Sequence, residues 1–155
     1  MSSRQKRVAM LVEHRERALG QRVEQLNLAR SLVEAARTRV DSEQERLRLA
    51  TERRRELLQG ALQAGDWAET QSWVEDTSRC YARARGELLQ AEAKVRNAQN
   101  EAVAARNDLK RLQVLMDRLL ASARRTEERA EQKATDEHAG RARRNAAARV
   151  KERSA

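Results

Sequence analysis

The chain has 155 residues, of which 37% are charged and 2% aromatic, and its formal net charge is +9. With no Phe and no Pro, it is too poor in large apolar side chains for an ordinary globular core, and no apolar run is long enough for a membrane span. Its richness in Ala, Glu, Arg and Leu is typical of coiled coils, in which burial is confined to a narrow seam.

Residues 3–62 are predicted to form one helix with a repeating apolar stripe. The first column of this stripe, repeating every seven residues, is Val12, Leu19, Leu26, Val33, Val40, Leu47, Arg54 and Ala61. A second column, three residues later, is Arg15, Arg22, Ala29, Ala36, Glu43, Ala50 and Leu57. Because seven residues are fewer than two full turns of a straight helix, the pattern predicts a left-handed supercoil with a partner helix.

Residues 63–66 interrupt the pattern and are predicted to form a turn. Gly65 has no Cβ, so we expect it to take the positive φ that ends many helices. Asp66 is a favourable N-cap residue, and Glu69 three positions later completes a variant of the capping box. These residues predict that one helix stops here and that a second helix begins at Trp67.

Residues 67–123 are predicted to form the second helix, which carries two columns of its own. The first is Trp67, Val74, Tyr81, Leu88, Val95, Ala102, Leu109 and Met116; the second is Thr70, Thr77, Ala84, Ala91, Ala98, Ala105, Leu112 and Leu119. The first columns of the two helices are mirror images about residue 64, so that Val33 comes level with Val95 when the chain folds back. The predicted fold is all-α: a long antiparallel two-helix coiled-coil hairpin whose second helix overhangs the first.

Residues 124–155 lie beyond any counterpart on the first helix. They contain ten Lys or Arg residues against six Asp or Glu residues, and almost no large apolar side chains. We therefore expect a basic helical overhang or a frayed tail. A projecting basic end of this kind favours docking into a partner.

The sequence predicts no catalytic, cofactor-binding or metal-binding group of residues, so we expect that the protein is not an enzyme. His14 and His138 lack a metal-ligand partner at helical spacing and are expected at exposed positions. Cys80 is the single cysteine, which excludes an internal disulfide and fits a reducing cytoplasm. Neither residue type has the neighbours that nucleophilic catalysis requires.

Trp73 stands out from the seam because it lies one position before Val74, on the flank. A large aromatic side chain there is either a contact for another protein or a cover over Leu57 or Leu58 near the turn. The sequence leaves both interpretations open.

Three stretches make the chain similar to the family of the flagellar export protein FliJ, a component of the type III export apparatus. They are Trp67 with Gln71–Val74, the basic run Asp108–Arg118, and the tail Glu128–Ala139 with its Asp136-Glu137 pair. The length, the single hairpin and the basic charge also match this family over the whole chain.

The resemblance implies a non-enzymatic central stalk, similar to the shaft of rotary ATPases. In this family the paired-termini end of the hairpin enters the hexameric export ATPase and promotes its assembly and activity. The positions matching that end are Arg4, Lys6 and Arg7 on the first helix and Lys133, Asp136 and Glu137 on the second.

The second helix of the family contacts the cytoplasmic domain of the export gate through a stripe that begins with an aromatic residue. The matching positions here are Trp73, Thr77, Cys80 and Ala84, of which we carry over only Trp73 as a gate-binding residue. The resemblance also implies escort of export chaperones and a cytoplasmic location, peripheral to the inner face of the cytoplasmic membrane, without a transmembrane segment.

Three alternatives remain open at this point. The first is the corresponding stalk protein of an injectisome (SctO-type), which has different partners but would act through the same steric and electrostatic contacts. The second is a basic coiled coil that binds nucleic acid or serves as a scaffold; acidic residues interrupt its basic stretches, which disfavours nucleic acid as a partner. The third is a homodimeric coiled coil, including a domain-swapped dimer that uses the same seam.

Overall fold

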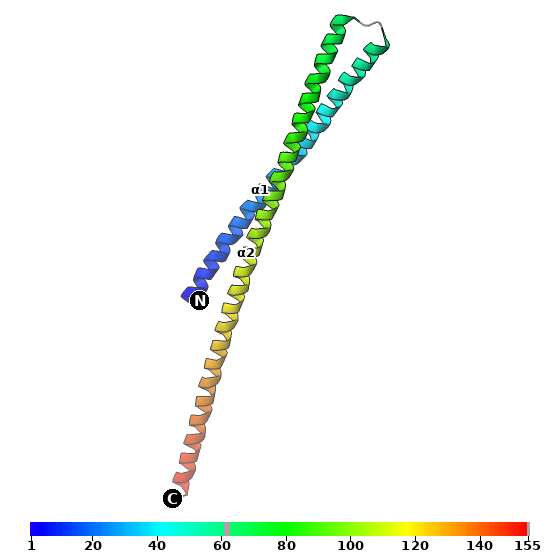
Figure 1. Ribbon diagram of the computed structural model, residues 1–155. Coiled ribbons are helices and arrows are strands. Elements are labelled where there is room, and N and C mark those ends of the chain that lie inside the picture. Colours follow the sequence, from blue (N-terminus) through cyan, green and yellow to red (C-terminus); the bar gives the residue numbers. More distant parts are fainter. Residues whose placement is uncertain (61–62, 155) are drawn as a thin grey trace. The chain divides into compact units, whose positions relative to one another are not determined.

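The computed structural model describes residues 1–60 and 63–154, and these form two long helices and no strand. Helix α1 is Ser3–Gln59 and helix α2 is Ala64–Arg153 (Figure 1). The predicted all-α helical hairpin is confirmed, since the two helices pack against each other. The chain divides into two compact units, a hairpin unit of residues 15–107 and an end unit of residues 1–14 with 108–155, and each is described separately.

Local interactions explain why such polar segments remain helical. With no Pro in the chain, every backbone N–H is available for the helix ladder. Arg and Glu residues three or four positions apart bridge successive turns: Arg48 bonds Glu45 at 2.7 Å and Glu52 at 2.9 Å. Each such exposed pair contributes only about 0.2–0.5 kcal/mol, so the pairs support the helices without replacing the seam.

The hairpin unit buries the two predicted columns on each helix. The buried or half-buried positions of α1 include Leu19, Leu26, Ala29, Val33, Ala36, Val40, Glu43, Leu47, Ala50, Arg54 and Leu57. Those of α2 include Trp67, Thr70, Val74, Thr77, Tyr81, Ala84, Leu88, Ala91, Val95, Ala98, Ala102 and Ala105. The two predicted members that remain exposed are Arg15 and Arg22, because removing a charged guanidinium from water is costly.

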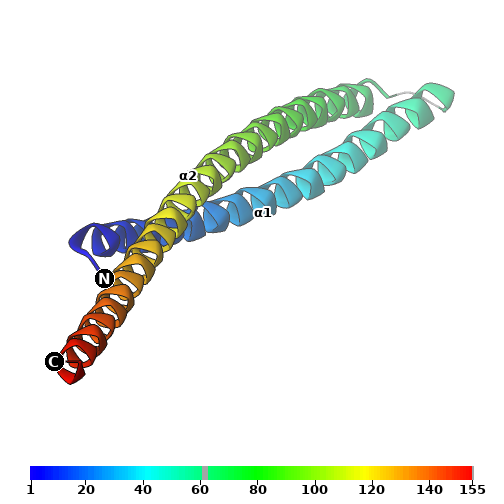
Figure 2. The same cartoon turned by 90° about the horizontal axis from the view of Figure 1, so that it is seen from below.

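Two ion pairs and one shared hollow fix the antiparallel register of the hairpin unit. Arg22 contacts Glu101 at 2.7 Å and Arg39 contacts Glu87 at 3.1 Å, each pair joining α1 to α2. Val33 and Val95 line the same surface hollow, at the common level that the mirrored columns predicted. Figures 1 and 2 show the cyan part of α1 and the green part of α2 running side by side in opposite directions.

The seam of the hairpin unit is thin because its most deeply buried side chains are small. Ala50 has no exposed surface, and Thr77 and Ala84 are each 2% exposed. The Thr77 hydroxyl donates to the carbonyl oxygens of Trp73, at 2.8 Å, and Val74, at 3.2 Å, on its own helix. The buried Thr77 hydroxyl therefore has its hydrogen bonds within α2 and needs no partner on α1. The small side chains of the seam allow the two helices to approach closely.

The end unit begins with a capping box that sequence inspection missed. The Ser2 hydroxyl accepts a hydrogen bond from the Gln5 backbone N–H at 3.2 Å, and the Gln5 side chain accepts one from the Ser2 N–H at 2.8 Å. This reciprocal pair is the Ser-x-x-Gln signature of a helix start. It also holds Gln5 in a buried position beside the apolar Val8.

Helix α2 continues well past the residues that face the start of α1. Met1, Ser2 and Gln5 line one surface hollow with α2 residues between Leu119 and Glu127. Beyond Ala123, every residue to Ser154 is exposed except Gly140, which is half-buried, and the helix runs on to Arg153. In Figure 1 this orange-to-red end of α2 extends past the N-terminus.

The predicted turn chemistry at Gly65 and Asp66 was wrong in detail. Helix α2 begins at Ala64, so both residues are helical, and no residue in the described ranges has a positive φ. The Trp67 N–H donates to the Gln63 carbonyl at 3.1 Å, which makes Gln63 the residue that opens the helix. Asp66 instead lies in the first turn, where its carboxylate favourably meets the positive end of the helix dipole. Residues 61 and 62, including Ala61 of the first column, lie outside the described residues.

Candidate interaction sites at the flank and end of the hairpin

Trp73 lies on α2 at the flank of the seam and remains 40% exposed. It lines an open hollow together with Thr70 and the charged residues Arg53, Asp66 and Glu69. Of the two residues that the indole could cover in the alternative interpretation, Leu58 is 62% exposed, whereas Leu57 is buried. The indole is therefore a partly accessible aromatic surface surrounded by charge, a combination that is common at protein contacts.

The other positions of the aromatic-led stripe differ sharply in accessibility. Thr77 and Ala84 are buried in the seam, whereas Cys80 is half-buried. Thr77 and Ala84 cannot reach another protein while the two helices remain packed. Of the four stripe positions, only Trp73 and Cys80 present surface to a partner.

The first turns of α1 display the three basic residues Arg4, Lys6 and Arg7, all of which are exposed. The capping box accounts for their direction, because it fixes the start of the helix and turns Gln5 and Val8 inward. Lys6 and Arg7, which lie between these two buried positions, then point away from α2. The sequence signal for this helix start is Ser2 followed three residues later by Gln5.

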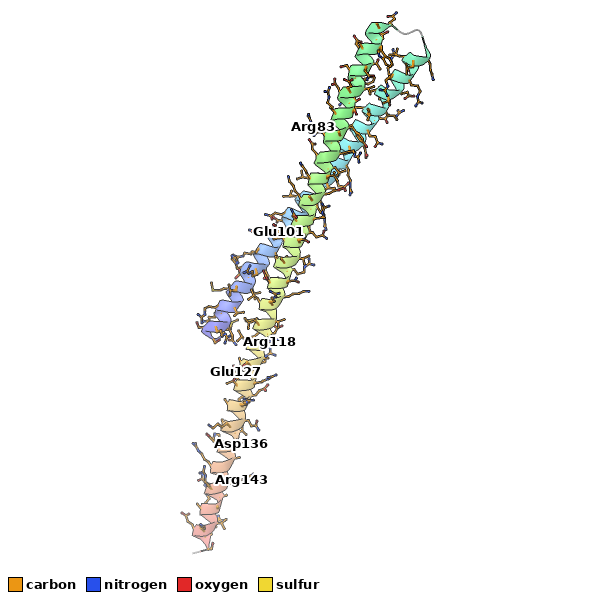
Figure 3. All side chains as sticks on the ribbon, in the orientation of Figure 1. Arg83, Glu101, Arg118, Glu127, Asp136 and Arg143 are labelled. Carbon is orange, nitrogen blue, oxygen red and sulfur yellow. The ribbon has the colours of Figure 1, made fainter. Side chains whose placement is uncertain are left out.

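Lys133, Asp136 and Glu137 are exposed on the part of α2 that continues beyond the start of α1. Their spacing of three and four residues places them on one helical face. Figure 3 labels Asp136 on this part of the helix. Lys133 is six residues past Glu127, the last residue lining the hollow with Met1, which is about 9 Å along a helix. Within the end unit, Lys133, Asp136 and Glu137 therefore lie further along α2 than the residues that line the hollow with Met1.

Among the described residues, no His, Cys, Asp and Glu side chains form a group that could hold a metal ion. His14 and His138 are exposed, and Cys80 has no disulfide partner. Among the described helices, none has a stretch sufficiently long and apolar to cross a membrane. Exposed charges and the partly exposed indole of Trp73 are the surface features that can contribute to contacts with other macromolecules.

These features define a class of protein: an all-α helical hairpin with exposed charged residues along the end of its second helix. A family model described as the flagellar FliJ protein matches residues 4–148. The chain therefore belongs to the FliJ family and is a protein of the flagellar export system. No curated protein and no solved structure matches this chain.

Proposed function

We propose that this protein is the non-enzymatic central stalk of the flagellar type III export ATPase. The observation that carries the proposal is the end of α2, where a helix of highly charged, exposed residues continues beyond the start of α1. A helix without an internal partner and with charges on all sides is suited to the centre of a ring of subunits. Membership of the FliJ family supports the flagellar system over the injectisome counterpart.

The proposed mechanism is steric and electrostatic. The end of α2 enters the pore of the hexameric ATPase, where Lys133, Asp136 and Glu137 pair with charges on the surrounding subunits. Arg4, Lys6 and Arg7 lie at the start of α1 and meet the rim of the ring. Charge pairs across such an interface determine orientation and the rate of association more than they add affinity. The stalk in this way favours assembly of the ring and raises its activity.

Trp73 is the proposed contact with the cytoplasmic domain of the export gate. Its exposed indole and the surrounding Arg53, Asp66 and Glu69 provide an aromatic anchor with a polar rim. Contacting the gate and the ATPase at different places lets one molecule connect the two. We extend the proposal to escort of export chaperones and to a position in the cytoplasm, peripheral to the membrane.

Charge reversal at the end of α2 tests the ATPase part of this proposal. A variant carrying Lys133→Glu, Asp136→Lys and Glu137→Lys should need at least about tenfold more protein for half-maximal stimulation of the cognate export ATPase. Lys94→Glu is the matched control, since Lys94 is exposed on α2 within the hairpin unit and should leave stimulation unchanged. Equal stimulation by the triple variant and the control would contradict the proposed contact.

A further inference from the structure

The charges at the end of α2 are segregated on either side of Gly140. Residues 127–137 contain five acidic and two basic side chains, whereas residues 141–153 contain six basic and one acidic. Both sections are helical and exposed. A second helix of the same sequence, running in the opposite direction and centred on the same residue, would set each acidic section against a basic one.

One face of this helix carries four charged residues that flank Gly140. Asp136 and Glu137 precede Gly140 by four and three residues, and Arg143 and Arg144 follow it by three and four. Residues at these spacings share a helical face. In a two-fold antiparallel pair centred on Gly140, Asp136 comes opposite Arg144 of the second copy, and Glu137 comes opposite Arg143. Each contact occurs twice, which gives four ion pairs around the centre.

The groups that would form these pairs are available in the single chain. Within the described residues, no ion pair engages Asp136, Glu137 or Arg143. The Arg144 Nε donates only to the Gly140 carbonyl of its own helix, at 3.3 Å. A Cβ added at Gly140 would meet nothing within 4 Å, so the space next to its Cα is open.

We propose that the end of α2 associates with a second copy of this chain as an antiparallel pair centred on Gly140. An acidic partner would satisfy residues 141–153 but would be repelled by residues 127–137, whereas a second copy satisfies both sections. The pairing is confined to the centre, because Arg129 and Lys151 are brought near each other at the outer edge. Exposed ion pairs are individually weak and are screened by salt, so the association is weak and salt-sensitive.

This inference does not rest on the proposed stalk role, although the two share Asp136 and Glu137. A chain paired through these residues cannot also present them to an ATPase. Self-association would therefore keep the charged end covered until the ATPase displaces the second copy. The test uses the purified protein alone, so its outcome is independent of any ATPase measurement.

Sedimentation velocity of the full-length chain at low and high salt provides the first test. Self-association is expected at about 50 mM salt and should be lost at about 500 mM, where screening acts within about 4 Å. The variant Asp136→Arg/Glu137→Arg and the variant Arg143→Glu/Arg144→Glu should each raise the dimer dissociation constant at least about tenfold. An equimolar mixture of the two variants should restore association, as should the chain carrying all four substitutions.

The mixture separates this pairing from other dimers. A swapped dimer using the hairpin seam would persist in both variants, and general attraction between charged molecules would not be restored by the four-residue reversal. Either result, or a monomer at low salt, would overturn the proposal. Circular dichroism of each variant verifies that helicity is retained.

Cysteine cross-linking tests the register. In a Cys80→Ser background, Gly140→Cys should form an intermolecular disulfide on mild oxidation, because residue 140 meets its own copy at the centre. Ala147→Cys is the matched control, since Ala147 is exposed and lies seven residues on along the same face. In the antiparallel pair the two copies of residue 147 are fourteen residues apart, about 21 Å. Efficient cross-linking through residue 147, or none through residue 140, would contradict this arrangement.

Discussion

Glu45 and Arg48 illustrate how individual charged residues maintain these helices. The pKa of the Glu45 carboxyl lies below its ordinary value, primarily because Arg48 donates hydrogen bonds of 2.7 and 2.9 Å to it. The same contacts, with a further bond to Glu52, raise the pKa of Arg48. Both carboxylates are exposed, so each bond is a small local support and is repeated along α1 by similar pairs.

The first prediction concerns the titration of Glu45. Arg48→Gln should raise the Glu45 pKa towards its ordinary value, whereas Arg46→Gln should leave it unchanged, because Arg46 bonds Glu43 instead. A lowered pKa in the folded chain stabilises the fold above the unfolded-state pKa, and this contribution disappears as the pH falls through the folded-state value. Carboxyl NMR titration of the three chains measures the effect. An identical Glu45 titration in all three would show that Arg48 does not cause the shift.

Trp73 carries the second prediction. Trp73→Ala should weaken binding to the cytoplasmic domain of the export gate by at least about thirtyfold, the loss typical of a central aromatic contact of about 2 kcal/mol. Leu58→Ala is the matched control, because Leu58 is a similarly exposed apolar residue near the same end of the hairpin. Isothermal titration calorimetry with the isolated gate domain provides the measurement. Unchanged affinity for the Trp73 variant would remove this residue from the gate contact.

At the scale of the helices, the seam was predictable because the burial of apolar side chains dominates its formation. The seven-residue repeat places Val33, Leu47 and Ala84 on buried faces, and no competing core exists to override that pattern. The helix ends were less predictable, since their chemistry is local and degenerate. Gly65 and Asp66 fit a turn as well as a first helical turn, while the Ser2–Gln5 capping box was decided by side-chain bonds across three residues.

The third prediction tests how tightly the two helices approach. Ala50→Leu should destabilise the hairpin by about 1–3 kcal/mol, because Ala50 has no exposed surface and the added carbons force the helices apart. Ala35→Leu makes the same chemical change at an exposed position of α1 and should change stability by less than about 0.5 kcal/mol. Urea unfolding followed by circular dichroism compares the two. Equal stability of both variants would mean that the seam has room for a larger side chain.

At the scale of the whole molecule, different stretches of the same two helices differ in which side chains they bury and which they expose. The small residues of the hairpin unit hold α1 and α2 together, and Trp73 on the flank is the accessible aromatic group near the turn. In the end unit, the residues of α2 beyond Ala123 are exposed, apart from the half-buried Gly140. The sequence predicted an overhang from residue 124 onward, where the counterparts on α1 run out. The sequence did not predict that Lys133 lies beyond Arg4 rather than beside it. That placement follows from the structure, in which Met1 and Glu127 line the same hollow.

The most direct test of the stalk proposal is the activity of the cognate export ATPase, titrated with the intact chain and with a chain truncated after Glu128. This truncation keeps Thr126 and Glu127, which line the hollow beside Met1, and should leave the melting temperature of the hairpin nearly unchanged. We predict that the intact chain stimulates the ATPase and that the truncated chain does not. Equal stimulation by a folded, truncated chain would place the contact elsewhere. No stimulation by the intact chain would contradict the stalk function itself.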